Sequence, residues 1–495
     1  MILGELFKNL SYTVVMGSLE QTVNNIAYDS RSAASGMVFV CLPGAVTDGH
    51  LYAAGAYKNG ARMFVCEYFP KSLSEYSDIT VVTVTDTRYA LAQMSVRFFD
   101  SPAKRLKVIG ITGTKGKTSI SFMLKSIFET AGKKAGIIGS TGVYYGDTVF
   151  KLPNTTPESY ELQKIFYDMA EAGMEYAVLE ATSQGFFMHR TDGVVFDVAL
   201  FTNFSPDHVS NIEHPDVEHY LKSKKKIFNQ CDFCFINGDA DDFEQITDGI
   251  SCEWGTFGFT PKSDYYADDV TLSLNGKAMS VEFICHTPQW SHPARVNIPG
   301  AFSASNAMAA VCAADRLGID RQAIIKGLAG AVVKGRMELV EVPAPYTVMI
   351  DFAHNALSVR SLMETAKQYN PQRIICIFGL EGNRAKIRRY DSGEIIGRFA
   401  DLTILANASP RTENPADIIS DIIVGLERSG GEYLVIPDRS EAIRYALDHA
   451  RSGDLILLVG KGNVLYEEVN GQNIYFNERE VVADYFRERQ SAISS

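Results

Sequence analysis

The stretch Arg105–Ser119 constrains this chain more than any other, because a β-branched run there breaks into a glycine-spaced turn and then a helical pattern. The run 108–111 predicts a buried strand. Gly113 and Gly116 let the backbone curl with its N–H groups facing inward, and the helix that follows offers its positive N-terminus to an anion. The stretch therefore predicts a cradle for phosphate groups at the carboxyl end of a strand.

Inside this cradle, Lys117 is expected to lie against the β- and γ-phosphates of a nucleotide, with the Thr118 hydroxyl on a magnesium ion. The predicted nucleotide-binding loop consists of Gly113, Thr114, Gly116, Lys117, Thr118 and Ser119. Its spacing is shorter than the usual Walker pattern, since Ile111 stands five positions before Gly116. A pattern this short also arises by chance in ordinary strand–turn–helix units, so that alternative stays open on these residues alone.

The 495 residues are too many for one core and predict three domains, at 1–100, 101–333 and 334–495. Hydrophobic residues make up 46% and charged residues 21%, as in soluble globular proteins. No apolar run approaches the ~18–20 residues that span a bilayer. The first ten residues lack a basic region and a cleavage site, so they predict a domain's first helix. We expect a cytoplasmic monomer without membrane insertion.

The net charge of −12 argues against a nucleic-acid partner, because phosphate backbones are bound through an excess of lysine and arginine. Acidic ligands must therefore be held by local basic residues. The eight cysteines are scattered, which fits a reducing compartment better than a disulfide framework. Cys231 and Cys234 form a lone C-x-x-C within an apparent strand, and we expect core packing there rather than a metal site.

The first hundred residues predict a small α/β domain, with strands near 38–42 and 63–67 and a helical segment at 51–59. Two loops of this domain gather polar residues: Asp29, Ser30, Arg31, Thr47, Asp48, Gly49 and His50. Polar loops on a small α/β scaffold suit a sugar nucleotide. The alternative is two turns with capping residues.

The segment 101–333 alternates strands and helices in the manner of a doubly wound parallel sheet. Glu180 ends one apolar run, and Asn203, Asp207 and His208 follow another. Ligands bind beyond the carboxyl ends of such strands, so three ends are expected to converge on one nucleotide, with Glu180 and His208 as candidate metal ligands. For each of these residues, a helix cap or a structural hydrogen bond is the alternative.

A run of lysines follows at 220–228, YLKSKKKIF, which contains Lys222, Lys224, Lys225 and Lys226. Such a run usually forms a solvated helix face. One of these lysines is nevertheless expected to turn inward toward the phosphates.

From residue 334 on, short apolar strands again alternate with helical patterns, which predicts a second Rossmann-like sheet. Polar residues follow these strands: Asp351, His354, Asn355, Asn383, Arg384, Ser409, Pro410, Arg411, Thr412, Glu413 and Lys461. The predicted fold class is therefore α/β in three domains: a small α/β N-terminal domain, a central P-loop doubly wound parallel sheet and a C-terminal Rossmann-like domain.

Eight motifs occur along the chain in the order GTKGKTS, NTTPE, EATSQG, TNFSPDH, SNAMAA, GRME, DFAHN and SPRTENP. With these motifs the chain resembles the Mur ligase family nearly from end to end. Within the family it is most similar to the enzymes that add the third amino acid to UDP-N-acetylmuramoyl-L-alanyl-D-glutamate. The resemblance implies an N-terminal domain for the uridine diphosphate, a central ATPase and a C-terminal domain for the incoming amino acid.

The resemblance also implies roles for individual residues. Positions that hold the UDP-linked substrate are Ser30, His50, Thr155, Thr156, Ser183 and Arg190. Positions that contact ATP outside the phosphate loop are Asn203, Asn306, Arg336 and Asp351. Magnesium positions are Thr118, Glu180, His208 and Lys224. Lys224 aligns with a lysine that is carbamylated in the family, and this N6-carboxylysine would be an anion able to orient a second magnesium ion.

The implied reaction is an ATP-driven amide synthesis, in which the γ-phosphoryl group passes to the D-glutamyl carboxylate and gives an acyl phosphate. The amine of the incoming amino acid then attacks, and phosphate leaves. Two anions meet in the first step, so magnesium and Lys117 are expected to neutralise charge. The residues expected to act in catalysis are Lys117, Lys224, His208, Glu180 and His354, the last near the γ-phosphate.

Several positions depart from the family pattern. Lys115 replaces an asparagine in the phosphate loop, Gln184 replaces a histidine, and Met188 replaces a glutamine that would contact the peptide substrate. These departures put contacts to the peptide part of the substrate in question.

The expected amino-acid site comprises Arg384, Ser409, Pro410, Arg411 and Gly460. Family members specific for meso-diaminopimelate carry Asp-Asn-Pro-Arg where this chain has residues 408–411. The retained arginine would form a bidentate pair with the distal carboxylate. The glutamate expected to take the distal ammonium is replaced by Val464. Diaminopimelate is the favoured substrate, with a variant amino acid and lysine as alternatives.

Two further functions stay open. A folylpolyglutamate-type ligase would share the ATPase and part of the third domain, but the DSR and DGH segments of the first domain argue against it. A paralogue that binds a cell-wall precursor or a nucleotide without ligation would account for the departures. Retention of Lys117, Thr118, Glu180, Lys224 and His208 favours an active ligase.

Overall fold

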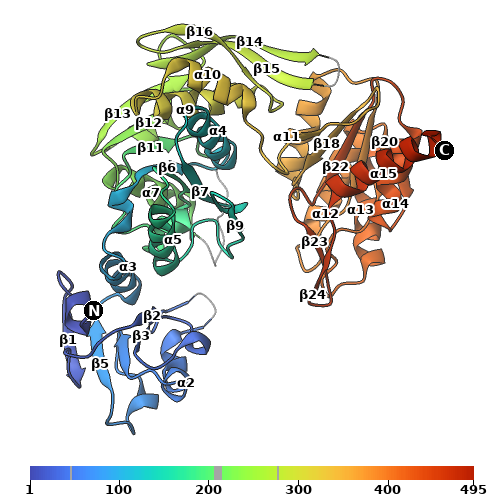
Figure 1. Ribbon diagram of the computed structural model, residues 1–495. Helices are drawn as coiled ribbons and strands as arrows, with labels where there is room; N and C mark the ends of the chain where they lie inside the picture. The colour runs from blue at the N-terminus through green and yellow to red at the C-terminus, as the bar shows by residue number, and fades with distance from the viewer. Residues whose placement is uncertain (45–46, 206–213, 276–277, 495) are drawn as a thin grey trace. The chain divides into compact units, whose positions relative to one another are not determined.

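The computed structural model describes residues 1–44, 47–205, 214–275 and 278–494. The chain forms two compact units, one made of Met1–Tyr266 and Met308–Gly327 and the other of Ala267–Ala307 and Leu328–Ser495. The first unit contains two α/β sheets and the second contains one (Figure 1).

A five-stranded sheet opens the first unit, in the order β1-β5-β4-β3-β2. Its elements are α1 (Leu3–Leu6), β1 (Tyr12–Met16), β2 (Asn25–Ala27), η1 (Ser30–Ser32), β3 (Met37–Val40), η2 (Gly49–Tyr52), α2 (Ala53–Lys58), β4 (Met63–Cys66), η3 (Lys71–Leu73), β5 (Thr80–Val84) and α3 (Thr87–Phe98). All neighbouring strands are parallel except β1 and β5. Alternation along β3 places Val38 and Val40 in the core with α1 and α3, and Phe39 in the core with α2.

The central sheet is parallel from β7 to β13, in the order β7-β10-β6-β11-β12-β13. Its strands are β6 (Lys107–Thr112), β7 (Ala135–Gly139), β10 (Tyr176–Glu180), β11 (Val198–Phe201), β12 (Phe233–Asn237) and β13 (Glu253–Gly258), with β8 (Gly142–Tyr145) and β9 (Thr148–Phe150) added antiparallel at one edge. The sheet confirms the predicted doubly wound class, and the C-x-x-C pair lies in and just before β12, where Cys234 is buried.

Helices cover both faces of this sheet. The helical elements are η4 (Pro102–Arg105), α4 (Lys117–Thr130), α5 (Ser159–Glu171), α6 (Ser183–Phe187), α7 (Val217–Lys225), η5 (Lys226–Asn229), α8 (Phe243–Thr247), α9 (Phe302–Arg316) and α10 (Arg321–Gly330). One face packs on α5 and the other on α4, where the Ser126 hydroxyl donates to the Gly327 carbonyl of α10 at 2.7 Å.

The order of strands positions the functional site. β6 lies between β10 and β11, with Ile111 paired with Glu180 and Thr112 paired with Phe201. The carboxyl ends of these three strands are therefore adjacent, as the sequence predicted. The phosphate loop leaves β6 at this edge, and Glu180 ends β10 beside it.

The second unit is built on a six-stranded sheet in the order β17-β18-β22-β19-β20-β21. Its elements are β17 (Glu338–Val340), β18 (Thr347–Asp351), α11 (Ala356–Gln368), β19 (Ile374–Phe378), α12 (Ile387–Phe399), β20 (Leu402–Leu405), α13 (Pro415–Ser429), β21 (Tyr433–Val435), α14 (Arg439–His449), β22 (Leu455–Val459), β23 (Tyr466–Val469), β24 (Gln472–Tyr475) and α15 (Glu478–Ser494). Helices α11, α12 and α13 share a core with one face, and α14 and α15 with the other (Figure 1). All pairs are parallel except β17–β18, which confirms the Rossmann-like prediction.

Strand β14 (Tyr265–Asn275) continues from the first unit into the second, where β15 (Ala278–His286) and β16 (Ser291–Val296) form an antiparallel pair. Among the residues that the structure describes, no helix is both long and apolar enough to cross a bilayer.

Candidate active site

The phosphate loop depends on two glycines in left-handed conformations. Gly113 has φ +139°, and a Cβ there would lie 2.0 Å from the Thr202 hydroxyl oxygen. Gly116 has φ +92° and caps the N-terminus of α4. Side chains at these positions would strain the turn or displace Thr202. The sequence therefore folds into the predicted cradle with the first turn of α4 at its base.

Two lysines converge on one carbonyl oxygen of this loop. Lys117 Nζ donates to the Gly113 oxygen at 2.7 Å, and Lys224 Nζ donates to the same oxygen at 3.0 Å. Lys224 is only 2% exposed, and its ammonium lies 4.5 Å from the centre of the Tyr220 ring. By contrast, Lys222 is exposed. One member of the lysine run does turn inward, and it is the lysine for which the resemblance implies carbamylation.

The predicted magnesium ligands Thr118 and Glu180 touch each other. The Thr118 hydroxyl donates to Glu180 Oε2 at 3.1 Å and lies 2.9 Å from the Ser140 hydroxyl, and the Ser140 amide donates to Glu180 Oε1. The carboxylate is buried, and a Cβ on Gly139 would meet it at 2.2 Å. Hydroxyl and carboxylate oxygens are ligands that Mg²⁺ prefers. His208, the third candidate, lies outside the described residues.

Asn203 fixes the middle of the phosphate loop through its side chain and its backbone. Its Oδ1 accepts from the Lys115 amide at 2.9 Å, and its Nδ2 donates to the Lys115 carbonyl at 3.1 Å. Its own carbonyl accepts from the Thr114 amide. The Lys115 side chain is exposed, so the loop uses only the backbone of this residue. This explains how a lysine is accommodated where the family pattern has asparagine.

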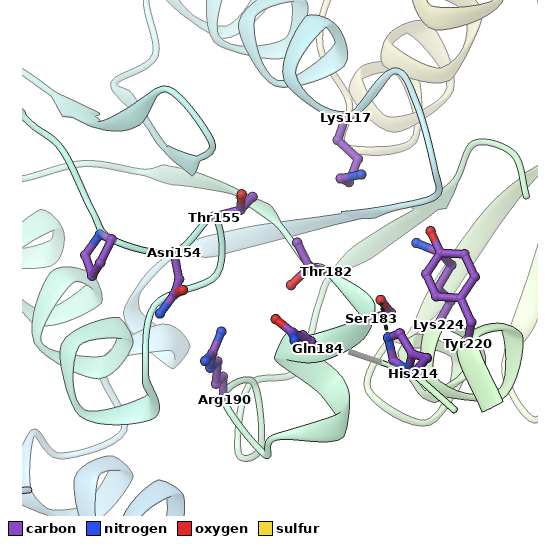
Figure 2. Close-up of a pocket in the computed structure, with 11 residues that line it drawn as sticks. Lys117, Asn154, Thr155, Thr182, Ser183, Gln184, Arg190, His214, Tyr220 and Lys224 are labelled. Atoms are coloured by element: carbon purple, nitrogen blue, oxygen red, sulfur yellow. Dashed lines mark hydrogen bonds between the residues drawn. The ribbon is translucent and has the colours of Figure 1, made fainter. Parts of the chain in front are cut away.

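A pocket of about 250 Å³ opens beside the two lysines (Figure 2). Its lining residues are Lys117, Pro153, Asn154, Thr155, Thr182, Ser183, Gln184, Arg190, His214, Tyr220 and Lys224. The pocket joins the predicted phosphate-loop lysine to the predicted substrate residues Thr155, Ser183 and Arg190. Its polar lining, with cations on two sides, suits an anionic substrate.

Arg190 is held in this pocket by a carboxylate that the sequence analysis had given no role. Glu158 Oε1 accepts from Arg190 at 2.7 Å, and Glu158 Oε2 accepts from Arg88 of α3 at 3.2 Å. A third bond runs from Arg190 to the Thr156 carbonyl at 3.2 Å. The carboxylate thus links the N-terminal sheet's helix to the pocket and fixes the direction of the Arg190 guanidinium.

His214 was also missed, because a single histidine between the TNFSPDH motif and the lysine run carries no signal of its own. It is fully buried, with Nε2 2.9 Å from the Ser183 hydroxyl and Nδ1 2.9 Å from His219 Nδ1. Figure 2 shows the dashed contact with Ser183. Only the fold brings it to the pocket, and it positions the Ser183 hydroxyl.

Thr156 does not line the pocket. Its hydroxyl donates to the Glu180 carbonyl at 2.8 Å and lies 2.9 Å from the Thr182 hydroxyl, and the residue is fully buried. Thr156 therefore supports the end of β10.

The two polar loops of the N-terminal sheet carry the capping interactions that the sequence left as an alternative. Asp29 accepts from the Arg31 amide at the start of η1, which contains Ser30. Asp48 accepts from the His50 amide at the start of η2. The buried His50 ring also engages both of its nitrogens, Nδ1 with Asp48 at 2.6 Å and Nε2 with the Glu67 amide at 2.9 Å. Caps of this kind are compatible with ligand binding by the loop surface.

In the second unit, the predicted adenine-nucleotide residues Arg336 and Asp351 lie close to His354. Buried Asp351 accepts from the amides of Met337 at 2.8 Å and Ala353 at 2.7 Å, and burial raises its pKa. Burial, together with the positive charge of Arg336, lowers the pKa of His354, so its imidazole is neutral at pH 7. Asn306, the remaining predicted contact in this unit, is buried on α9.

The predicted amino-acid residues of the second unit form a compensated charge cluster. Arg411 and Arg384 both approach Glu381 Oε2, at 3.0 Å and 3.3 Å, and Arg411 Nε lies 3.2 Å from Glu468 Oε2. The hydroxyl of buried Ser409 accepts from the Glu468 amide at 3.2 Å. The structure thus brings the two arginines together, and it adds two glutamates that the sequence had not assigned.

Gly460 lies at the end of β22 in the same unit. It has φ +110°, and a Cβ there would meet the Gly379 carbonyl at 2.2 Å. The close approach of these two strand ends therefore requires glycine.

Comparisons with known proteins decide the family. Three models match in succession: "Mur ligase family, catalytic domain" at residues 22–99, "Mur ligase middle domain" at 111–314 and "Mur ligase, glutamate ligase domain" at 335–462. UDP-N-acetylmuramoyl-L-alanyl-D-glutamate–2,6-diaminopimelate ligase of Caldanaerobacter subterraneus subsp. tengcongensis is 38% identical over 99% of this chain and 100% of its own length. The chain belongs to the Mur ligase family.

Solved structures agree with this assignment. A ligase of the same name superposes on this Mur ligase with a TM-score of 0.71 and 25% identity, covering 99% of both chains. The homologous ligase of Clostridium perfringens is 37% identical over 98% of this chain and 99% of its own. A folylpolyglutamate synthase from Mycobacterium tuberculosis, complexed with ADP and AMPPCP, has a TM-score of 0.59 and covers only 76% of this chain and 92% of its own. Mur ligases form ADP from ATP, so this chain is an ATP-dependent amide ligase.

Proposed function

We propose that this Mur ligase adds meso-diaminopimelate to UDP-N-acetylmuramoyl-L-alanyl-D-glutamate, as a cytoplasmic monomer that serves peptidoglycan synthesis. ATP phosphorylates the D-glutamyl carboxylate, and the amine of diaminopimelate displaces phosphate from the acyl phosphate. The observation that carries the proposal is the pocket that both Lys117 of the phosphate loop and Arg190 of the substrate motif line. The names of the full-length relatives support the choice of substrates.

The residues of the first unit divide the work of phosphoryl transfer. The loop amides and Lys117 bind the phosphates and offset the charge that builds up when a carboxylate approaches them. Arg190, fixed by Glu158, orients the anionic substrate from the other side of the pocket. Thr118 and Glu180 fit Mg²⁺, which neutralises charge on the β- and γ-phosphates when bound. Holding the carboxylate close to the γ-phosphorus accounts for most of the remaining rate enhancement.

Carbamylation of Lys224 forms part of the proposal. Its ammonium and that of Lys117 are at most 5.7 Å apart, the sum of their 3.0 Å and 2.7 Å bonds to the Gly113 oxygen. Two like charges at this distance in a buried site oppose each other. Conversion of Lys224 to a carbamate exchanges this repulsion for attraction. Mass spectrometry after trapping, or ¹³C NMR with labelled bicarbonate, would detect the carbamate; an unlabelled lysine at full activity would contradict it.

We propose that the amino-acid site recognises diaminopimelate through the arginine–glutamate cluster. Arg411 and Arg384 would take the distal carboxylate in place of Glu381. Glu468, beside Arg411, would accept the distal ammonium. It would thus take the role of the glutamate that the family pattern has at position 464, where this chain has valine. The Arg411 amide donates to the Glu468 carbonyl at 2.8 Å, which fixes the two side chains next to each other. Lysine has no distal carboxylate and so could not take the place of Glu381 beside the arginines.

The test is a reaction of the purified chain with ATP, magnesium and UDP-N-acetylmuramoyl-L-alanyl-D-glutamate against a panel of amino acids. We expect phosphate release and a product of the added mass with meso-diaminopimelate, and little with lysine. Product with another amino acid would correct the specificity alone. Activity on a folate acceptor, or ATP turnover without any acceptor, would refute the ligase reaction proposed here.

A further inference from the structure

A cluster of two cysteines and one histidine lies inside the N-terminal sheet, apart from the pocket described above. Cys66 ends β4, and Cys41 directly follows β3. Val40 pairs with Val65, so the two cysteines are the next neighbours in register. Their sulfur atoms are 3.5 Å apart, and a ring nitrogen of His50 completes a set whose ligand atoms lie within 4.8 Å of one another. All three side chains are buried.

The His50 ring is oriented by a carboxylate, as the rings of metal-binding histidines typically are. Asp48 Oδ1 accepts from Nδ1 at 2.6 Å, which leaves the lone pair on Nε2. Metal-bound histidines typically make this second contact to a carboxylate. Asp48 also accepts from the Tyr68 hydroxyl at 2.6 Å, and the Tyr68 ring stacks on the His50 ring with centroids 4.1 Å apart. A metal ion at Nε2 would displace the hydrogen bond from the Glu67 amide.

The geometry points to zinc. We propose that Cys41, Cys66 and His50 bind one Zn²⁺ ion, with the fourth position open to water. Two thiolates on a tetrahedral zinc ion lie roughly 3.8 Å apart, given Zn–S bonds of about 2.3 Å, and the two sulfurs are 3.5 Å apart. Two thiolates also cancel the charge of the ion, so the occupied site is neutral in the buried interior. Thiolate and imidazole ligands together select zinc over magnesium or calcium.

The site would tie the loop that carries His50 to the ends of β3 and β4. That loop is one of the two polar loops expected to face the uridine nucleotide. Zinc would therefore fix the shape of this loop, and its role is independent of the phosphoryl-transfer site. Tyr68, which stacks on the His50 ring, is about half exposed.

The experiment uses the full chain, purified without chelators and dialysed against Zn²⁺, with bound metal measured by elemental mass spectrometry. We expect one zinc ion per chain, and with Co²⁺ a thiolate-to-cobalt charge-transfer band. Cys66→Ala should lose both signals. Cys252→Ala is the matched control, because its sulfur lies 3.5 Å from Cys231 in a different group of close cysteines, and it should keep both signals.

A graded variant tests the role of the carboxylate. Asp48→Asn keeps the shape of the side chain but weakens its hold on His50, so zinc affinity should fall by about 10- to 100-fold. Circular dichroism checks that each variant is folded. The proposal is overturned if the wild-type chain binds no metal and shows no cobalt–thiolate band, or if Cys66→Ala retains the zinc. A Cys41–Cys66 disulfide in protein isolated under reducing conditions would overturn it as well.

Discussion

The phosphate site of the first unit and the amino-acid site of the second use charge in opposite ways. At the phosphate loop, Lys117 and Lys224 both donate to the Gly113 carbonyl, which places Lys117 where the phosphates of a nucleotide are expected. At the amino-acid site, Arg411 and Arg384 are already paired with Glu381 and Glu468. We therefore expect the first site to bind phosphate groups through its loop, whereas in the second site the arginines must exchange their glutamate partners to bind an amino acid. Rate should therefore depend on the first site and discrimination on the second.

The largest effect should follow removal of the Lys117 charge. Lys117→Met is expected to lower kcat by about 10³-fold, because a preorganised cation acts on the charge that develops in the transition state. Steady-state ADP formation with the UDP-linked dipeptide and diaminopimelate measures this. Lys222→Met, on the exposed face of α7, is the control and should retain wild-type rates. Equal losses in the two variants would contradict a specific role for Lys117.

Substitution in the amino-acid site should change specificity more than rate. Arg411→Met is expected to raise KM for diaminopimelate by about 10- to 100-fold, since a charge-assisted bidentate contact is lost, with a smaller change in kcat. KM for ATP should stay the same. Arg360→Met, an exposed arginine on α11, serves as the control. A fall in kcat with unchanged KM for the amino acid would argue that Arg411 does not bind substrate.

A smaller effect should follow loss of the carboxylate charge that positions Arg190. Glu158→Gln keeps the shape of the side chain but weakens its bonds to Arg190 and Arg88. KM for the UDP-linked dipeptide should rise about 10-fold, in line with the loss of one charged hydrogen bond. Lys164→Met, on the exposed side of α5, should not change it. An unaltered KM in Glu158→Gln would show that Arg190 needs no such support.

The last prediction concerns the stability of the second unit and leaves catalysis aside. Burial lowers the pKa of Lys461 to about 8. An unfolded lysine titrates near 10.4, so between these values the unfolded chain holds a proton that the folded chain lacks, and this group makes folding more favourable as pH rises. Lys461→Met removes the contribution. At pH 7 the variant should therefore unfold with a larger free energy than the wild type. This difference in free energy of unfolding should shrink by up to about 3 kcal/mol from pH 7 to pH 10. If the free energies of unfolding of the wild type and the variant differ by the same amount at every pH, the lowered pKa of Lys461 would be contradicted.

The sequence predicted which residues gather at the phosphate loop, because its motifs use local backbone chemistry. Gly113, Gly116, Lys117 and Thr118 are close in sequence, and the parallel pairing of β10 with β6 places Glu180 beside them. The three-domain α/β class followed from the same periodicity. Glu158, His214, Glu381 and Glu468 could not be found in this way, since each acts through a partner that only the tertiary fold brings near. The same holds for Cys41 and Cys66, which become neighbours only through strand register.

Isotope transfer tests the central claim most directly. The D-glutamyl carboxylate of UDP-N-acetylmuramoyl-L-alanyl-D-glutamate would carry a heavy-oxygen label, and the phosphate released with ATP and diaminopimelate would be analysed by mass spectrometry. An acyl phosphate on the proposed pathway predicts one labelled oxygen in each phosphate. Phosphate without label, formed together with the amide product, would contradict the account.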